Sequence, residues 1–229
     1  MSKRDLLLFY FPSVAFRRAA KSVLVRELGT AQATRIWAET PGRMRALRKT
    51  RPKHSLGVNF LVLYMEKDVA LFQSALAEGL STKEAGELVR KINWKIFEPM
   101  TAISFKLSRL RSAHLLRRVS WLMDVMFSVL FTSPFQRVVQ PSNDAVAFDV
   151  TACPLADYFN SLGVPELTRY AACNLDHDMA MQWGLELKRT KTIADGAPLC
   201  DFRFQRIGAD AVEQDMTGEG FVDSKQRSR

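Results

Sequence analysis

The residues of this chain best suited to chemistry are three cysteines, an aspartate and a histidine between residues 153 and 200. Cys153, Cys173 and Cys200 are the only cysteines among 229 residues, and Asp176 and His177 follow Cys173 by three and four residues. Residues at these spacings share one face of a helix. The three thiols, the carboxylate and the imidazole are therefore the predicted catalytic residues.

These residues are compatible with more than one kind of site. A thiolate of Cys173 or Cys153 could attack a substrate, with His177 as the base. Two or three thiolates with His177 or Asp176 could instead hold a divalent metal such as zinc, although the Cys-x2-Cys spacing of common structural zinc sites is absent. Free cysteines are also often simply buried. The sequence leaves open whether the site works without a cofactor or binds a divalent metal such as zinc.

Other catalytic signatures are missing from the sequence. It has no G-x-S-x-G nucleophile elbow, no P-loop lysine motif and no dinucleotide-binding glycine pattern. His54 and His114 stand in basic stretches without a spaced partner. The thiol region is where we expect the chemistry.

The elements that must position the thiols follow from hydrophobic spacing and from prolines and glycines. Cys153 lies where a strand over 144–150 meets a helix that begins at Pro154. Cys173 lies in a helical stretch over 165–184, and Cys200 near the start of a strand over 199–207. Segments 135–140 and 185–193 are the expected hairpin partners of the two strands. Helices 154–162 and 165–184 separate the two hairpins.

The first 131 residues are predicted to be helical. Helices are expected over 12–28, 30–39, 56–78, 81–97, 100–110 and 113–131, the fourth starting with a capping box at Ser81 and Glu84. Breaks are expected at Gly29, at Thr40–Pro41–Gly42 and at Pro99, with a basic linker over 43–55.

The predicted fold class is α+β, with an N-terminal helical layer followed by a small antiparallel sheet and two inserted short helices. We divide the chain into a basic helical arm (1–55), an α+β domain (56–207) and a disordered tail (208–229).

The net charge of +9 comes from the arm. Residues 1–55 carry 13 Lys or Arg against three acids, whereas the rest carries 20 against 21. A basic amphipathic helix within residues 1–28 could contact an anionic membrane surface, or the arm could pack on the main domain with its charges in water. No nucleic-acid reader motif accompanies the charge, so no nucleic-acid partner is expected.

The cysteine count favours a cytoplasmic protein with reduced thiols, membrane association being left open. Three is an odd number, and no cleavable signal within the arm is convincing. The unbroken apolar run over 60–65 is too short to span a bilayer.

Several separated blocks resemble the L-2-amino-thiazoline-4-carboxylic acid hydrolase family. They cover roughly residues 56–206 and include Phe148–Asp149–Val150–x–x–Cys153–Pro154, Gly163–Val164–Pro165–Glu166–Leu167, Cys173–Asn174–Leu175–Asp176, the run 186–196 and Cys200–Asp201–Phe202–Arg203–Phe204. A weaker likeness is to small-molecule-binding domains of the 4-vinyl reductase type.

The resemblance implies a small-molecule substrate and hydrolysis of a carbon–nitrogen bond in a cyclic amidine. The family reaction opens a 2-amino-thiazoline ring to N-carbamoyl cysteine. Such a reaction needs a nucleophile, a proton donor and a group that holds the substrate carboxylate. Cys173 or Cys153 with His177, or a metal-bound water, would supply the attack, and Arg189 or Arg203 would pair with the carboxylate.

Two alternatives to this reaction follow from the Phe-, Met- and Leu-rich helices and the basic arm. One is an enzyme of specialised metabolism that uses the family scaffold on a more apolar substrate. The other is a non-catalytic domain that binds or senses a small molecule. The sequence leaves the oligomeric state unknown.

Overall fold

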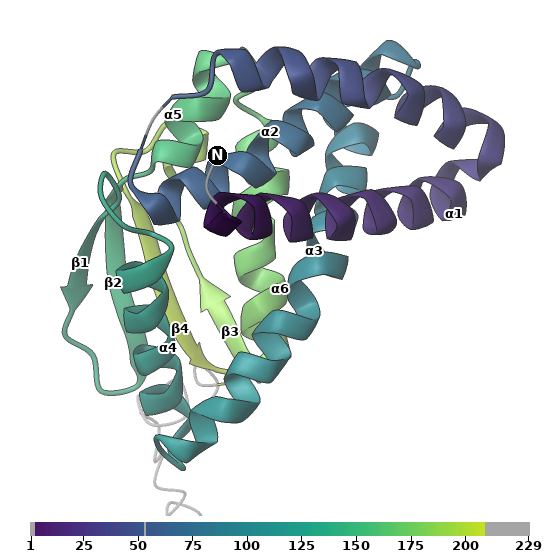
Figure 1. Cartoon of the computed structure of the whole chain (residues 1–229). Helices are drawn as coiled ribbons and strands as arrows, with labels where there is room; N and C mark the ends of the chain where they lie inside the picture. The colour runs from purple at the N-terminus through teal and green to yellow at the C-terminus, as the bar shows by residue number, and fades with distance from the viewer. Residues whose placement is uncertain (1–2, 53, 209–229) are drawn as a thin grey trace, which may run out of the picture.

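The computed structural model describes residues 3–52 and 54–208, which form a helical layer beside a four-stranded antiparallel sheet (Figure 1). The longer helices are α1 (Lys3–Lys49), α2 (Leu56–Ala77), α3 (Thr82–Leu107) and α4 (Leu115–Val129), and two short helices, α5 (Pro154–Ser161) and α6 (Asn174–Gln182), follow the first hairpin. The strands are β1 (Gln136–Gln140), β2 (Ala145–Ala152), β3 (Leu185–Lys188) and β4 (Cys200–Arg206). The α+β class is confirmed. The predicted tail lies, apart from Gly208, outside the described residues.

The sheet joins the two predicted hairpins through their second strands. Its order is β1-β2-β4-β3, and β2 and β4 pair antiparallel with Phe148 opposite Phe202 and Val150 opposite Cys200. This register places Cys200 opposite Val150, which precedes Cys153 by three residues. Cys200 therefore lies near the end of β2. Strand β3 is shorter than expected, because the chain turns through a 3-10 helix (Ile193–Asp195) before β4.

One face of the sheet packs on helices and the other is polar. Side chains alternate along a strand, so Phe148 and Phe204 join a core with residues of α4 and α6. Asp149 and Arg203 lie on the opposite face. The inner face therefore carries the apolar side chains, and Cys200 among them.

Helix α1 is part of the helical layer. Phe16, Val23 and Leu24 are buried in the same core as residues of α2, α3 and α5. The helix bends at Gly29 (φ 77°, ψ 166°), which confirms the predicted break there. Before the bend Glu27 pairs with Lys91 of α3, and after it Arg35 pairs with Glu78 beyond α2. The boundary that we draw at residue 55 stays a prediction.

The predicted break at Thr40–Pro41–Gly42 is wrong, and so is the linker over 43–49, since α1 continues to Lys49; residues 50–52, 54 and 55 do lie between helices. Ile36 and Thr40 are both fully buried, and the Thr40 hydroxyl donates a hydrogen bond of 2.8 Å to the Ile36 carbonyl. Packing of this face outweighs the N–H that Pro41 lacks.

The predicted helix end at Pro99 is also wrong, because α3 runs through it to Leu107. Residues at the end of α6 bind carbonyl groups beside the proline. Gln182 donates to the Glu98 carbonyl at 3.0 Å, and the Trp183 indole N–H donates to the Thr101 carbonyl at 3.2 Å. These tertiary hydrogen bonds hold α3 against α6 on both sides of the proline, and this packing outweighs the loss of the N–H that would donate to the Lys95 carbonyl.

Candidate functional site

Cys173 lies where the helix changes type. The helix predicted over 165–184 is present over 167–182, but residues Arg169–Cys173 form a π-helical turn in it, and α6 begins at the next residue. Such turns are rare and often occur at functional sites. Gly86 of α3 lets this turn approach closely, because a Cβ at that position would lie 2.4 Å from the Tyr170 ring.

The structure brings the three thiols into one neighbourhood. Cys153 precedes α5, Cys173 ends the π-helical turn and Cys200 starts β4, and all three are free cysteines. They are near enough to influence one another, since Cys200 contributes to the pKa of Cys153 and both contribute to that of Cys173. Whether any of the three thiols is catalytic stays a prediction.

Burial keeps these thiols protonated. It raises the pKa of Cys153 to about 11 and that of Cys173 to about 12, and it raises the pKa of Cys200 although the Ile193 N–H donates to its sulfur at 3.2 Å. Only a thiolate is a strong nucleophile. At neutral pH the resting site therefore presents neutral thiols.

Arg189 is the charged centre of this neighbourhood. Its side chain is 3% exposed and follows β3. Its terminal nitrogens donate to Asp176 Oδ2 at 2.8 Å and to the Cys173 carbonyl at 2.9 Å, and its guanidinium lies 4.9 Å from the centre of the Phe202 ring. Its Nε is buried without a hydrogen-bond partner in the described structure. One donor of a fixed guanidinium is thus left for a ligand.

Asp176 links Arg189 to the surface, since its side chain is 28% exposed. Burial raises the pKa of its carboxyl, and Arg189 opposes that shift. His177 is exposed, and burial of part of its ring, together with Arg189, lowers its pKa. No hydrogen bond among the described residues joins His177 to Cys173. The predicted thiol–imidazole pair is therefore not formed, because Cys173 points into the core and His177 outward.

Arg203 lies away from the thiols, on the outer face of β4. Its guanidinium contacts Asp149 at 2.9 Å and donates to the Phe148 carbonyl at 2.9 Å. Alternation along the strand separates it from Cys200. Of the two predicted carboxylate-binding arginines, the structure places only Arg189 beside the thiols. The roles of all these residues stay predictions.

Residues 3–52 and 54–208 contain no cluster of side chains that could coordinate a metal ion. No three His, Cys, Asp or Glu side chains of that part lie close enough together to hold an ion.

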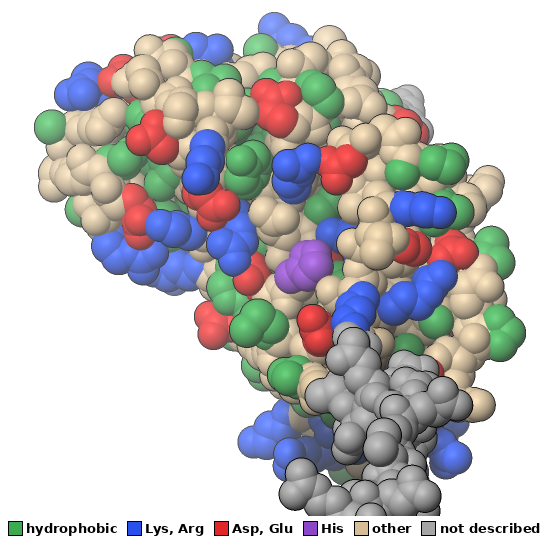
Figure 2. All heavy atoms as spheres, turned by 180° about the vertical axis from the view of Figure 1, so that it is seen from behind, with side chains coloured by type: hydrophobic (Ala, Val, Ile, Leu, Met, Phe, Trp, Pro, Cys, Tyr) green, Lys and Arg blue, Asp and Glu red, His purple; other side chains and the backbone are tan. Residues whose placement is uncertain are grey.

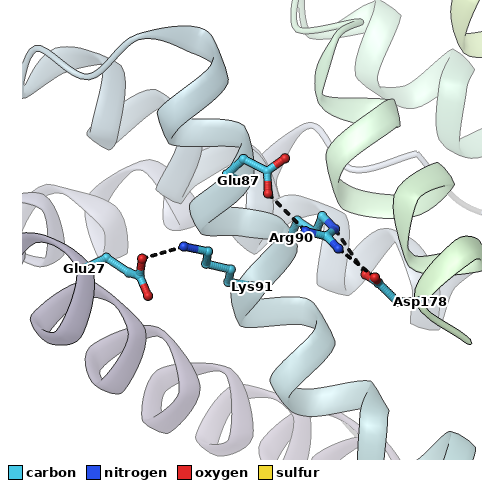
Figure 3. A network of polar contacts seen from close by, with 5 residues as sticks. All are labelled: Glu27, Glu87, Arg90, Lys91 and Asp178. Carbon is cyan, nitrogen blue, oxygen red and sulfur yellow. Dashed lines mark hydrogen bonds and ion pairs between the residues drawn. The ribbon is translucent and has the colours of Figure 1, made fainter. Parts of the chain in front are cut away.

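Ion pairs fix α6, the helix of Asp176, against α3. Arg90 of α3 contacts both carboxylate oxygens of Asp178, at 2.6 and 3.1 Å, and also contacts Glu87 at 3.2 Å (Figure 3). The neighbouring Lys91 reaches Glu27 of α1 at 2.5 Å. The sequence gives no hint of these pairs, because 88 residues separate Arg90 from Asp178.

A buried aspartate behind the π-helical turn, Asp68, was also not predicted from the sequence. Asp68 of α2 and Asn93 of α3 are fully buried, and Asn93 donates to Asp68 Oδ2 at 2.8 Å and to the Ala171 carbonyl at 3.5 Å. Burial raises the pKa of Asp68 to about 7. The remaining side-chain oxygens of both residues lack a partner among the described residues. The signal in the sequence is the charge triplet Glu66–Lys67–Asp68 within an apolar helix.

Residues 70–204, which contain every predicted site residue, match the family described as L-2-amino-thiazoline-4-carboxylic acid hydrolase. The chain belongs to this family. The match confirms the resemblance seen in the sequence.

No curated protein matches this chain. Among solved structures, it is similar to the Fe(II) unliganded H-NOX protein from K. algicida, with a TM-score of 0.45, 10% identity and coverage of 84% of this chain and 94% of that chain. A single-residue mutant of the same protein gives a TM-score of 0.40 at 8% identity, with coverage of 83% and 94%. Structural similarity with TM-scores below 0.5 gives no information about the function of this chain.

Proposed function

We propose that this chain is a hydrolase of a small cyclic amidine that bears a carboxylate, with 2-amino-thiazoline-4-carboxylate as the first candidate substrate. Family membership supports the reaction class. The observation that carries the proposal is the buried guanidinium of Arg189, with an unpartnered Nε, beside three thiols and the carboxyl of Asp176.

Arg189 is suited to hold the substrate carboxylate. Asp176 and the Cys173 carbonyl fix its two terminal nitrogens, which leaves Nε as the donor without a partner. A charge-assisted hydrogen bond in a site shielded from water is strong, and a guanidinium that is already oriented loses little freedom on binding. The proposed contact is therefore through Nε.

Asp176 is the proposed general base. Burial raises the pKa of its carboxyl, which makes the carboxylate a stronger base, and its partial exposure admits water. It would take a proton from a water that attacks the amidine carbon and return that proton to the leaving group. The raised pKa values of the thiols favour this route over attack by a thiolate. Cys153, Cys173 and Cys200 would then line the site.

The bond that breaks distinguishes two outcomes after water adds to the amidine carbon. Loss of the ring sulfur from that carbon gives N-carbamoyl cysteine, and the net change is the gain of one water. Loss of the exocyclic nitrogen, which is the carbon–nitrogen cleavage, gives ammonia and a 2-oxo-thiazolidine carboxylate. Only the first opens the ring to the product expected of the family.

The test is to incubate the purified, reduced protein with L-2-amino-thiazoline-4-carboxylate and to follow products by mass spectrometry. The proposal predicts many turnovers, with a gain of the mass of one water for ring opening or with ammonia release for carbon–nitrogen cleavage. A folded protein that gives neither product over many hours would reject this substrate.

A second candidate function is binding without turnover. It is favoured by the neutral, buried thiols and by the absence of an imidazole bonded to them among the described residues. A binding domain would be stabilised by its ligand in thermal unfolding and would leave it chemically unchanged. The same incubation therefore separates the two functions. A cytoplasmic location and the absence of a nucleic-acid partner also stay predictions.

A further inference from the structure

The C-terminal half of α3 exposes a row of large apolar side chains. They are Met100, Ile103, Leu107 and, in the following 3-10 turn (Ser108–Leu110), Leu110, exposed by 55%, 60%, 58% and 90%. At about 100° per residue they fall within an arc of roughly 80°. Phe105, which stacks on Trp183 in the core, points the other way. We call these four residues the α3 stripe.

Basic side chains accompany the stripe, and acidic ones are missing. Residues 99–123 contain five Lys or Arg and no Asp or Glu. Lys106, Arg109 and Arg111, which alternate with the stripe along the chain, are all exposed. From behind, Lys and Arg side chains gather at the lower edge of the molecule, the end at which α3 stops and α4 begins (Figures 1 and 2). The surface is thus apolar and cationic together.

The turn at the end of the stripe is held in place from inside. The guanidinium of Arg118 is buried 3.9 Å from the centre of the Phe105 ring, and it donates to the Ser108 hydroxyl at 3.0 Å and to the Phe105 carbonyl at 2.6 Å. The exposed residues of the stripe therefore stand on a rigid support, and binding would not require that segment to fold.

Part of the apolar face of α1, where the sequence placed a possible membrane contact, is buried in the core. Phe16, Ala20, Val23 and Leu24 are at most 1% exposed and pack in the core. No helix of the described residues is long and apolar enough to cross a bilayer. Because these four side chains of α1 face the core, the exposed apolar side chains of α3 are the better candidate for a peripheral membrane contact.

We propose that the α3 stripe is a peripheral contact for a bilayer that contains anionic lipid. Isolated apolar residues are common on protein surfaces, but four on one helix face form a patch that calls for a partner. A lipid surface matches both properties, since apolar side chains enter the headgroup boundary while lysines and arginines meet lipid phosphates. The uniform positive sign over 99–123 favours this occupant over a second copy of the chain, whose stripe would repel it.

The test is flotation of the full chain with vesicles of phosphatidylcholine alone and with vesicles containing 30% phosphatidylserine. Wild type is expected to float with the anionic vesicles only, and less so in high salt. Lys106→Gln with Arg109→Gln should weaken binding about 25-fold, at about fivefold per basic residue. Replacing Ile103, Leu107 and Leu110 by Ser should weaken it more than tenfold.

The matched control removes exposed apolar residues elsewhere. Val139→Ser with Met181→Ser, at positions 64% and 71% exposed, should leave vesicle binding unchanged. All of these positions are on the surface, so each variant should keep the unfolding temperature of wild type. Failure of wild type to bind, equal binding to both vesicles, or full binding by the stripe variants would overturn the proposal. So would light scattering that shows a dimer which only the stripe variants disrupt.

Discussion

Burial sets the protonation of the residues that matter most in this protein. The thiols of the site stay neutral because a thiolate would be poorly solvated there, and Asp68 is kept near its midpoint at neutral pH for the same reason. Arg189 remains charged because Asp176 and a carbonyl accept its hydrogen bonds. Two predictions follow at this scale.

Thiol alkylation should be slow in the native protein. With pKa values of about 11 and 12 for Cys153 and Cys173, few thiolates exist at pH 7.5, so iodoacetamide should label these residues at least tenfold more slowly than free cysteine. Mass spectrometry of labelled peptides measures each rate, and the unfolded chain is the control. Native labelling as fast as in the unfolded chain would contradict the burial of these thiols.

Replacement of Asp68 by Asn should stabilise the protein increasingly as pH rises. The folded-state pKa of Asp68 is raised from 3.8 to about 7, so its protonated form is favoured, and the stability it contributes is lost between about pH 4 and pH 7. The Asn amide can donate to Asn93 Oδ1 at any pH. The difference in unfolding free energy, variant minus wild type, should grow by about 1.4 kcal/mol per pH unit in that window.

Urea unfolding of both proteins at pH 5, 6, 7 and 8 measures this difference. Lys67, whose charge lowers the pKa of Asp68, and Asn93 are present in both proteins. A difference that is constant from pH 5 to pH 8 would show that Asp68 does not titrate there.

The sequence could predict which types of residue belong to the candidate site. Thiols at the ends of elements, and an arginine after a strand, were recognisable before the fold was known. The positions of His177 and Arg203 were not, because strand alternation and the π-helical turn decide which way each side chain points. Neither has a sequence signature as clear as a capping box.

At the scale of elements, close approach of the π-helical turn to α3 is what places Cys173. Gly86→Ala would put a methyl group 2.4 Å from the Tyr170 ring, so the turn must shift. We expect a loss of about 1–3 kcal/mol in unfolding free energy and a fall in turnover. Calorimetry and the turnover assay measure both.

Gly42→Ala is the matched control for this substitution. Gly42 is also helical, and nothing lies within 4 Å of its added Cβ, so the change should be neutral or stabilising by helix propensity. Equal effects of the two substitutions would contradict the proposed role of Gly86.

The errors in the predicted elements have one cause. Hydrophobic spacing located each hairpin and the capping box at Ser81, which the structure confirms with both of its hydrogen bonds. Pro41 and Pro99 were interpreted as helix ends, but buried Thr40 and hydrogen bonds from α6 keep both helices intact. Local propensity gives way where burial and tertiary contacts around the proline outweigh the hydrogen bond that it removes.

In the molecule as a whole, α3 connects two parts through ion pairs, one to α6 beside the sheet and one to α1 in the helical layer. Arg90 binds Asp178 of α6, and the adjacent Lys91 binds Glu27 of α1 (Figure 3). Sequence alone could indicate an α+β protein with helices first and offered packing of the arm on the main domain as one alternative. It could not decide between that and a membrane contact, since such contacts join residues far apart in the chain.

Loss of the Arg90 contact should loosen α6. Arg90→Leu leaves the partly buried Asp178 without its bidentate partner and should cost about 1–3 kcal/mol of unfolding free energy. Arg26→Leu, which removes a surface pair with Glu27, should cost less than about 1 kcal/mol. Chemical unfolding compares them, and equal costs would contradict the assignment.

Binding of the substrate carboxylate by Arg189 is the proposed interaction on which the function depends most. The most direct measurement is kcat/KM of Arg189→Ala on L-2-amino-thiazoline-4-carboxylate, beside that of Arg203→Ala, whose guanidinium lies on the opposite face of β4. Loss of the only proposed charged contact should lower kcat/KM at least 100-fold for the first variant and less than threefold for the second. Near-wild-type activity of a folded Arg189→Ala protein, or a larger loss in Arg203→Ala, would contradict the account.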